Sequence, residues 1–367
     1  MNSPRVLIIN PFGIGDVLFS TPLIGAVRGQ YPHSFIGYIC NRRAREVLCN
    51  NPALDAIFVY EKDDYRDLWK VSRLRCIGRV AGFLAQIRKG RFDIAIDLSL
   101  GYQYSLILKL VGVRKRIGFN FHSRGKFLTD KVDISGFADK HVIEYYLDLL
   151  KPLGIMARGR CNGPRMYLSE EHNAGAGRFL AENGIAPNDM LVGLIPGCGA
   201  SWGLDAKYRR WGRENFAAVA DTLIGKHRVK IILFGDAKEE GLCREVRSLM
   251  KHEPVIACGR TSIGMFLSLA SRCALIVTND GGPLHMSVSL GVKTVSIFGP
   301  VDEKVYGPYP PSERHITVTA DVPCRPCYRN FKYVKCDSNR CLKEIRPEEV
   351  LAAAEKLLSG SVRCAAT

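Results

Sequence analysis

The sequence predicts an α/β protein with two domains, each built on a mostly parallel sheet with helices on both faces. Two observations support this class: short apolar runs alternate with helical stretches, and the alternation restarts after a stretch rich in Gly and Pro. A length of 367 residues also favours two domains, because it exceeds what one ordinary core accommodates. No apolar run reaches the roughly 18 residues needed to cross a bilayer.

The first half of the chain carries four expected strands, at residues 5–10, 35–40, 56–60 and 93–98. Between the third and the fourth, apolar residues recur at helical spacing and predict one long helix with a single apolar face. The residues of that face are Leu68, Val71, Leu74, Ile77, Ala81, Leu84 and Ile87. The opposite side of this helix is strongly basic.

Residues 152–189 are expected to connect the domains, because glycines and prolines interrupt the short elements there. We place the first domain at residues 1–165 and the second at residues 185–345. The second domain repeats the alternation, with strands expected at 191–195, 230–235, 255–259, 274–277 and 294–298. Residues 346–367 follow, with a helix from Pro347 to about Leu358. In two-domain sheets of this kind, such a helix can cross back to the first domain.

The most informative stretch is Thr278-Asn279-Asp280-Gly281-Gly282-Pro283-Leu284-His285. It follows the expected strand 274–277, and Pro283 suits the first turn of a helix, where an N–H is not needed. The glycine pair lets the backbone approach a ligand, and the free amides of the helix start can bind phosphate. We expect Asp280 and His285 to face one pocket. A plain tight turn with a helical His is the alternative, which the coincidence of these features at a strand end disfavours.

Two other strand ends carry small or polar residues. Gly13-Ile14-Gly15-Asp16 leads into a helix expected to begin near Asp16, whose carboxylate is either presented beyond the strand or serves as a helix N-cap. A dinucleotide-binding fold would have a third glycine where Leu18 stands, and no Walker A sequence occurs. This disfavours the dehydrogenase and P-loop classes. The loop at residues 196–201, Pro-Gly-Cys-Gly-Ala-Ser, suits backbone contact with phosphate.

Acids and cysteines of the second domain each have more than one interpretation. Glu239 and Glu240 follow a strand and are expected either to cap a helix or to accept hydrogen bonds from a ribose. A CxxC pair begins a group of cysteines for which a structural zinc site, a disulfide and simple thiols all stay open. The group consists of Cys324, Cys327, Cys336 and Cys341. The chain holds 13 cysteines and shows no secretory segment at its start, which favours reduced thiols and a cytoplasmic protein.

The net charge of +16 points to a polyanionic partner, either nucleic acid, anionic lipid or a phosphorylated glycan. Residues 66–131 hold 15 Lys and Arg against four Asp and Glu. This basic segment is either solvated surface or a surface that meets phosphates and an anionic bilayer, with Trp69 and Phe83 settling at the interface. No zinc-finger, RNP or KH signature occurs, which disfavours nucleic acid as the partner.

Three groups of residues closely resemble the motifs of glycosyltransferase family 9, the ADP-heptose:lipopolysaccharide heptosyltransferases. The first group is Thr278–His285, followed by Ser287–Gly291 and Phe298–Pro300. The second is Arg5–Ile9, followed by Gly13–Val17 and Thr21–Leu23. The third runs from Pro196 and Gly197 to Lys207 and Trp211. The resemblance covers nearly the whole chain. It implies the GT-B fold, in which two Rossmann-like domains with parallel sheets face each other, with the acceptor in the first domain and the donor in the second.

The resemblance also implies inverting transfer of a heptose from ADP-heptose to the inner core of lipopolysaccharide. Asp16 matches the proposed catalytic base, which takes the proton of the acceptor hydroxyl. The donor-side candidates are Pro196, Gly197, Ser201, Lys207, Arg209, Glu239, Glu240, Thr278, Asp280, Gly281, Gly282 and His285. The acceptor-side candidates are Gly15, Arg66, Arg73, Arg114 and Arg116.

The family's Lys-x-Trp-Pro motif is altered in this chain. It is replaced by Lys207-Tyr208-Arg209-Arg210-Trp211-Gly212, which has two more residues before the Trp. Lys207 matches the family's lysine and is the candidate for the donor diphosphate; because of the longer spacing, Arg209 or Arg210 is the alternative. The role itself follows from the chemistry, because the leaving nucleoside diphosphate gains charge that fixed cations and dipoles stabilise.

No Asp-x-Asp pair occurs in the chain, so we expect transfer without a divalent ion and with no cofactor besides the sugar-nucleotide substrate. The expected partners are a sugar nucleotide, a lipid-anchored phosphorylated glycan and the anionic surface of the cytoplasmic membrane, at whose inner face the enzyme would work. Three alternatives stay open. They are a family 9 transferase with another sugar donor or glycan acceptor, a non-catalytic protein that binds nucleotide sugars or anionic glycans, and a nucleic-acid binder.

Overall fold

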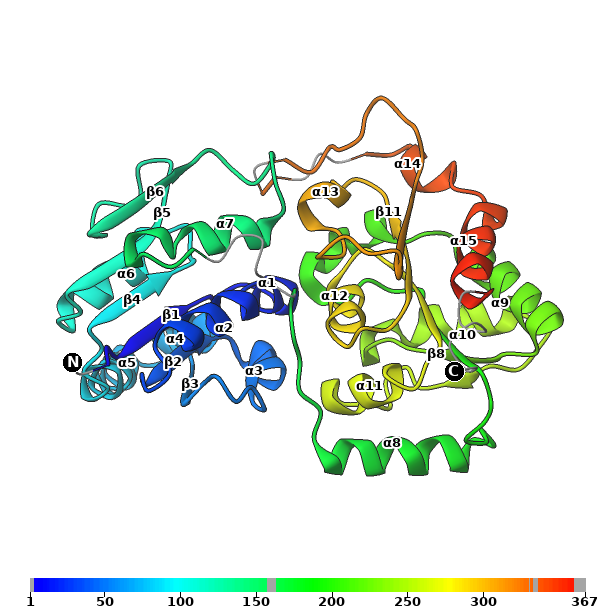
Figure 1. Ribbon diagram of the computed structural model, residues 1–367, viewed down its shortest axis with the longest axis horizontal. Coiled ribbons are helices and arrows are strands. Elements are labelled where there is room, and N and C mark those ends of the chain that lie inside the picture. Colours follow the sequence, from blue (N-terminus) through cyan, green and yellow to red (C-terminus); the bar gives the residue numbers. More distant parts are fainter. Residues whose placement is uncertain (1–2, 157–162, 330, 333–335, 360–367) are drawn as a thin grey trace. The chain divides into compact units, whose positions relative to one another are not determined.

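The chain divides into two compact units, Met1–Tyr167 and Leu168–Thr367, in a computed structural model (Figure 1). The structure describes residues 3–156, 163–329, 331–332 and 336–359. Each unit contains one six-stranded sheet in which all paired strands are parallel. The predicted α/β class with two parallel sheets is therefore confirmed. The unit boundary falls two residues beyond the predicted end of the first domain at residue 165.

The sheet of the first unit has the strand order β3-β2-β1-β4-β5-β6. Its strands are β1 Val6–Ile9, β2 Ile36–Cys40, β3 Ala56–Val59, β4 Ile94–Asp97, β5 Lys115–Phe121 and β6 Asp130–Ile134. Val6 of β1 is in register with Ile36 on one side and Ile94 on the other. The chain therefore leaves β1 in one direction and β4 in the other, so the topological switch point of this sheet lies between these two strands.

Helices of the first unit connect its strands. They are α1 Ile14–Phe19, α2 Thr21–Gln30, α3 Arg42–Leu48, α4 Lys62–Val71, α5 Arg73–Lys89, α6 Tyr102–Leu110 and α7 Val142–Asp148, followed by the 3₁₀ turn η1 Lys151–Leu153. One face of the sheet packs on α5 and α6, where Leu7, Ile87 and Leu108 share a buried apolar cluster. The central strands of such a sheet are buried on both faces, which explains why β1 and β2 are continuous apolar runs in the sequence.

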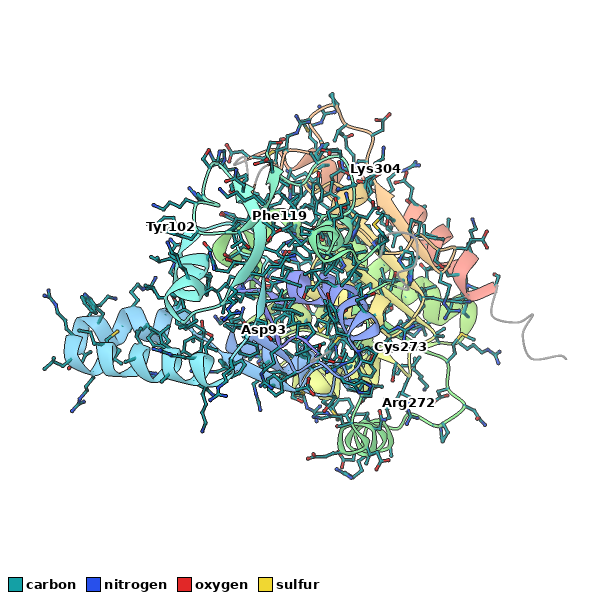
Figure 2. All side chains as sticks on the ribbon, turned by 60° about the vertical axis from the view of Figure 1, so that its left-hand side comes forward. Asp93, Tyr102, Phe119, Arg272, Cys273 and Lys304 are labelled. Carbon is teal, nitrogen blue, oxygen red and sulfur yellow. The ribbon has the colours of Figure 1, made fainter. Side chains whose placement is uncertain are left out.

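The single long helix predicted across residues 68–87 is wrong. Ser72 has extended backbone angles (φ −156°, ψ 108°) and ends α4, while its hydroxyl accepts a hydrogen bond from the amide of Arg75 as the N-cap of α5. The two helices pack on each other as a hairpin, drawn in pale blue in Figure 2. The apolar periodicity continues through Ser72, so spacing alone could not reveal the break.

The sheet of the second unit has the order β12-β11-β10-β7-β8-β9. Its strands are β7 Leu191–Ile195, β8 Lys230–Leu233, β9 Val255–Ile256, β10 Leu275–Asn279, β11 Thr294–Phe298 and β12 His315–Thr319. Numbered from its own first strand, this order is the same as that of the first unit. The switch point therefore lies between β7 and β10, which pair at Leu275 and Val192.

Helices of the second unit connect its strands and cover their apolar side chains. They are α8 Glu170–Glu182, η2 Ala200–Arg209, α9 Arg213–His227, η3 Ala237–Glu239, α10 Glu240–Leu249, α11 Ile263–Ala270, α12 Gly282–Ser289, α13 Glu303–Tyr306, α14 Arg340–Lys343 and α15 Pro347–Ser359. The last helix, α15, packs beside α9 (Figure 1). Val350, Ala354 and Leu357 of α15 are buried in the apolar core of this unit. The expectation that this helix crosses back to the first domain is therefore wrong for residues 347–359.

Candidate active site

Two loops meet at the switch point of the second unit. Asn279, the last residue of β10, donates from Nδ2 to the carbonyl oxygens of Pro196 (2.8 Å) and Gly197 (3.0 Å) in the loop after β7. Its Oδ1 accepts from the amide of Trp211 at 2.9 Å. One buried side chain thus holds the loop at residues 196–199, the loop at residues 280–282 and the segment before α9 together. This role of Asn279 is not evident from the sequence, because its partners are 68 or more residues away.

The glycines of these loops are required by close backbone packing. A Cβ on Gly281 would lie 2.3 Å from the carbonyl oxygen of Cys198, and one on Gly197 would lie 2.1 Å from Oε1 of Glu239. Gly281 is the N-cap of α12, and the first helical hydrogen bond runs from the amide of His285 to its carbonyl oxygen. The amides of Gly282 and Leu284 precede that bond, so the helix offers them to a ligand.

A buried ion pair joins the loop at residues 280–282 to the end of η2. Nη2 of Arg209 donates to Oδ2 of Asp280, and the two side chains are only 9% and 3% exposed. Oδ1 of Asp280 has no hydrogen-bond partner among the described residues. Burial raises the pKa of Asp280, and the adjacent Arg209 guanidinium opposes that rise. His285 is also buried, one turn into α12. Asp280 therefore serves first to hold a cation at the switch point.

Glu239 holds the loop after β7 in place through hydrogen bonds to its backbone. Its Oε1 accepts hydrogen bonds from the amides of Cys198 (3.1 Å) and Gly199 (3.2 Å) and from Nη2 of Arg210 (3.2 Å). Its Oε2 accepts from the amide of Asp236 at 3.3 Å, which completes a capping box. Glu239 therefore acts as a helix-capping residue, which was one of the two roles expected for it. Its partner in sequence, Glu240, begins α10 and pairs with Arg244 at 2.5 Å.

The remaining donor-side candidates differ in how firmly they are held. Thr278 is buried and donates from Oγ1 to the carbonyl oxygen of Asn279 at 3.0 Å. Lys207 is exposed, and its ammonium lies 5.0 Å from the ring centroid of Tyr208. The side chain of Ser201 lies outside the described residues. Two arginines directly before Trp211 are thus anchored by carboxylates, whereas the lysine of the altered motif is left at the surface.

The switch point of the first unit places Asp16 beyond β1. Gly13 is the N-cap of α1, and Asp16 is the third residue of that helix, half-buried. The helix begins two residues earlier than predicted, so the interpretation of Asp16 as the N-cap is wrong. Asn10 fixes this turn: its Nδ2 donates to the carbonyl oxygen of Asp16 at 3.0 Å, and its Oδ1 accepts from the amide of Phe12 at 3.1 Å.

A second acid, Asp97, ends the neighbouring strand β4 in register with Ile9 of β1. It is 1% exposed, and its Oδ1 accepts from the amide of Ser99 at 2.9 Å. Its Oδ2 is buried without a hydrogen-bond partner among the described residues. Burial raises the pKa of Asp97 to about 7, although the Ser99 contacts oppose that rise. Asp97 was not predicted as a site residue, although an acid that ends an apolar strand is a usable signal.

Three of the acceptor-side arginines have partners close to them in the sequence. Arg66 lies on α4 and pairs with Asp63 at 3.1 Å, while the Arg73 guanidinium lies 5.6 Å from the ring centroid of Trp69. Arg116 donates to the carbonyl oxygens of Phe127 (2.7 Å) and Val113 (2.5 Å), so it fixes the entry to β5.

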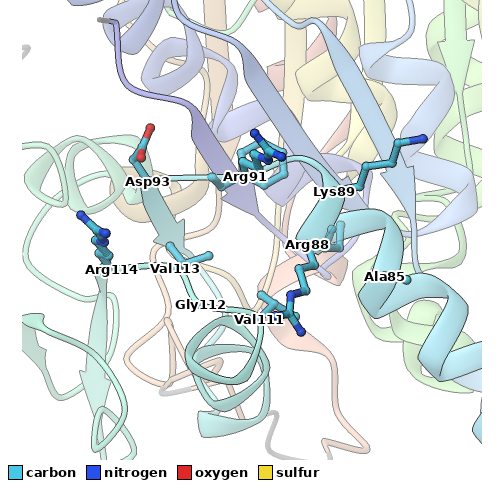
Figure 3. Close-up of a pocket in the computed structure, with 11 residues that line it drawn as sticks. Ala85, Arg88, Lys89, Arg91, Asp93, Val111, Gly112, Val113 and Arg114 are labelled. Carbon is cyan, nitrogen blue, oxygen red and sulfur yellow. The ribbon is translucent and has the colours of Figure 1, made fainter.

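Arg114 lines a different part of the unit, a shallow hollow of about 630 Å³ (Figure 3). Arg88, Lys89, Arg91 and Asp93 line the same hollow. Asp93 directly precedes β4, and Arg114 directly precedes β5. The hollow therefore lies at the amino-terminal ends of the strands, whereas Asp16 follows the carboxyl-terminal end of β1. Among the acceptor-side candidates, only Gly15 is adjacent to Asp16.

The four cysteines near the end of the chain are free thiols in one region of the second unit. The hydroxyl of Ser338 and the amide of Asn339 lower the pKa of Cys336, the latter from 3.3 Å. Burial raises the pKa of Cys341 to about 11, and the charges of Cys327, Cys324 and Cys336 add to that rise. Within the part of the chain that the structure describes, no three His, Cys, Asp or Glu residues are arranged as metal ligands.

Comparison with known proteins identifies the family. Glycosyltransferase family 9 (heptosyltransferase) matches residues 80–336, which include the switch-point loops of the second unit. A lipooligosaccharide heptosyltransferase 2 of Campylobacter jejuni is 34% identical over 276 residues, covering 74% of this chain and 77% of that protein. A lipopolysaccharide heptosyltransferase 2 of Salmonella typhimurium is 24% identical over 97% of this chain and 99% of its own length.

Solved structures agree over the whole length. The family 9 glycosyl transferase of Veillonella parvula superposes with a TM-score of 0.82 at 26% identity, covering 98% of both chains. The ADP-heptose lps heptosyltransferase II of E. coli superposes with a TM-score of 0.76 at 21% identity, covering 98% of this chain and 99% of that one. The two Rossmann-like units are thus those of the GT-B fold, and the resemblance drawn from the sequence motifs is confirmed. The chain belongs to glycosyltransferase family 9, the heptosyltransferases.

Proposed function

We propose that this protein transfers a heptose from ADP-heptose to the inner core of lipopolysaccharide, with inversion at the anomeric carbon. The names of the Campylobacter, Salmonella and E. coli relatives support the sugar and the acceptor. The observation that carries the proposal is the switch point of the second unit. There Arg209, Arg210 and the start of α12 bring positive charge and backbone amides to the edge where open α/β sheets bind nucleotides.

The donor diphosphate lies, in this proposal, against the amides of Gly282 and Leu284. The loop at residues 196–199 forms the other wall, because Asn279 and Glu239 hold it in place. Arg210 keeps a buried Nε without a partner among the described residues, so it has hydrogen-bonding capacity left for a phosphate oxygen. Lys207 supplies a mobile cation at the rim. These donors stabilise the charge that develops on the leaving ADP.

Asp16 acts as the general base toward the acceptor hydroxyl. An alcohol is a poor nucleophile at neutral pH, and a carboxylate that removes its proton during attack on the anomeric carbon contributes roughly 10²–10⁴-fold to the rate. The half-buried position of Asp16 on a turn fixed by Asn10 suits a group that must meet a substrate. The proton moves from the acceptor oxygen to Asp16 as the new C–O bond forms and the bond to ADP breaks.

The transfer needs no divalent ion in this proposal, because cationic side chains and helix amides take the place of a metal on the diphosphate. A chelator such as EDTA should leave ADP release unchanged in the purified enzyme. Loss of activity with the chelator and recovery with Mg²⁺ would contradict this part of the proposal. Zinc at the four cysteines would be structural only, and metal analysis of the purified protein decides whether it is present.

We place the enzyme at the inner face of the cytoplasmic membrane. The lipid-anchored acceptor of the proposed reaction lies in that membrane, and the +16 net charge favours an anionic surface. No helix among the described residues has the length and apolar character to cross a bilayer.

The test is a screen of sugar nucleotides for release of the nucleoside diphosphate, with and without a truncated lipopolysaccharide acceptor. ADP-heptose should be turned over only with acceptor, and the product should have the inverted anomeric configuration. Arg210→Met should raise KM for the donor, whereas Lys238→Met, an exposed lysine on η3, serves as the matched control. Turnover of a different sugar nucleotide would reassign the donor, and binding without any turnover would leave a non-catalytic binding protein.

A further inference from the structure

The α4–α5 hairpin has a distal end formed by the turn at Ser72. The amino-terminal end of α4 follows β3, and the carboxyl-terminal end of α5 leads through Phe92 to β4, so both of those ends are fixed to the sheet. Ile87, near the end of α5, is 1% exposed. The hairpin therefore extends from the sheet with its turn farthest from the core, as the pale-blue pair in Figure 2 shows.

Large apolar side chains are exposed around this turn. Trp69 is 48% exposed, Val71 79%, Leu74 84% and Ile77 55%; we refer to these four residues as the hairpin tip. Farther along α5 the apolar face is partly covered, since Phe83 packs against the core of the unit beside Tyr60. Phe83 is thus partly covered, whereas Trp69 is exposed; contact of either residue with an interface stays a prediction. Four large exposed apolar side chains within nine residues of one hairpin turn are a candidate contact site.

Basic residues surround the hairpin tip. Residues 62–89 contain eight Lys and Arg and three Asp, a net charge of +5. The three acids are used within the unit, because Asp63 pairs with Arg66, Asp67 with Lys70, and Asp64 with Arg42 and Arg79. Arg73 and Arg75 have no acidic partner among the described residues, and they lie on the first turn of α5 between the apolar side chains. The Arg73 guanidinium rests over the Trp69 ring.

We propose that the hairpin tip inserts into the headgroup region of an anionic bilayer, while Arg73 and Arg75 contact lipid phosphates. The inference rests on the proposed function, because a lipid-anchored acceptor requires contact with the membrane. Exposed Trp, Leu, Val and Ile next to arginines are the composition of segments that bind at lipid interfaces. A second copy of the chain is disfavoured as the occupant, since two hairpins of net charge +5 repel each other.

The experiment is co-sedimentation of the full-length protein with vesicles of phosphatidylethanolamine and phosphatidylglycerol, compared with phosphatidylcholine vesicles. The triple variant Val71→Ser, Leu74→Ser, Ile77→Ser should bind the anionic vesicles at least about tenfold more weakly, and Arg73→Gln with Arg75→Gln should bind roughly fivefold to thirtyfold more weakly. Leu110→Ser, which alters an apolar side chain on α6 that is 68% exposed, is the matched control and should bind like the wild type.

Two further measurements separate this inference from the proposed function. The triple variant should keep wild-type turnover on a deacylated, water-soluble acceptor and lose turnover on acceptor embedded in vesicles. Wild-type vesicle binding by the triple variant, or equal binding of the wild type to neutral and anionic vesicles, would overturn the inference. A wild-type dimer in solution that the triple variant abolishes would assign the tip to self-association instead. If the wild type turns over no sugar nucleotide but binds vesicles through the tip, the proposed function fails and the membrane contact stands.

Discussion

The two switch points of this chain have the same topology, but their buried acids are paired differently. In the second unit, between β7 and β10, every buried acid has a cation: Asp280 pairs with Arg209, and Glu239 with Arg210. In the first unit, between β1 and β4, the buried acid Asp97 has no ion-pair partner among the described residues. The strand order fixes where a ligand binds, and the side chains at the strand ends decide which chemistry is done there. In the proposed reaction, the switch point of the second unit binds the donor diphosphate, and that of the first unit removes a proton from the acceptor.

The largest expected effect is the loss of kcat on replacement of Asp16. Asp16→Asn keeps the size of the side chain and removes its basicity, so kcat should fall by roughly 10²–10⁴-fold while KM for the donor stays near the wild-type value. Steady-state ADP release measures both. Asp302→Asn, at the start of α13, is the control and should retain wild-type kcat. An Asp16→Asn enzyme within tenfold of the wild type would remove Asp16 from the mechanism.

Loss of the buried Arg209–Asp280 ion pair should lower the stability of the protein. Arg209→Met leaves Asp280 buried without its cation, which should lower the free energy of unfolding by about 3–5 kcal/mol, because an uncompensated buried charge is costly. Urea denaturation followed by tryptophan fluorescence measures the change. Arg209→Met combined with Asp280→Asn removes both charges and should recover most of the loss. Equal stability of the single and double variants would show that the pair does not act as a unit.

Removing the charge of Asp97 should raise the free energy of unfolding, whereas Arg209→Met should lower it. Its folded-state pKa of about 7 exceeds the value of about 4 expected for the unfolded chain, so the folded state holds the proton more tightly. The contribution of Asp97 to stability therefore falls as the pH rises from about 4 to about 7 and stays low above that.

Asp97→Asn should abolish this fall and make the protein more stable than the wild type at pH 8, by at most about 4 kcal/mol. Denaturation of both proteins across this pH range, analysed as the difference between them, isolates the contribution of the one carboxyl. A constant difference at all pH values would mean that Asp97 titrates normally.

A smaller effect should follow from the close packing of the donor-side loops. Gly281→Ala places a Cβ 2.3 Å from a backbone oxygen, so the loops must separate at a cost of about 1–3 kcal/mol, and ADP should bind about tenfold more weakly. Calorimetric titration with ADP measures the affinity. Gly241→Ala on α10, where a Cβ meets nothing within 4 Å, should leave binding unchanged. Normal ADP affinity in Gly281→Ala would argue that the loop geometry does not shape the donor site.

Most of the sheet architecture could be predicted from the sequence, and the departures have physical causes. The expected strand at 294–298 matches β11, because a strand buried on both faces needs an unbroken apolar run. Strands β5, β6 and β12 were not predicted. Lys115 and Arg116 begin β5, and Asp130 and Lys131 begin β6. Strands β6 and β12 are the outermost strands of their sheets, where incomplete burial makes a continuous apolar run unnecessary. The break at Ser72 was hidden because it leaves the apolar periodicity intact.

The sequence indicates those site residues that lie within one short motif. It does not indicate residues whose role depends on segments far apart in the chain. Gly281 and Asp280 stand out in sequence because turn glycines, an acid and a helix start are contiguous there. The roles of Asn279 and Glu239 depend on partners in the loop at residues 196–199, which periodicity and spacing do not report. Arg114 and Arg116 were assigned to the acceptor site by charge alone. In the structure they lie at the amino-terminal end of β5, whereas Asp16 follows the carboxyl-terminal end of β1.

The hydrogen bonds of Asn279 constrain what can replace it. Its amide nitrogen faces two carbonyl oxygens, and its amide oxygen faces one backbone N–H, so only one orientation of the amide satisfies all three. An aspartate of the same shape would set a carboxylate oxygen against the carbonyls of Pro196 and Gly197, and a leucine would leave all three groups without a partner. Libraries that seek to retune sugar specificity in this enzyme should therefore vary the surrounding loop positions and keep the carboxamide fixed.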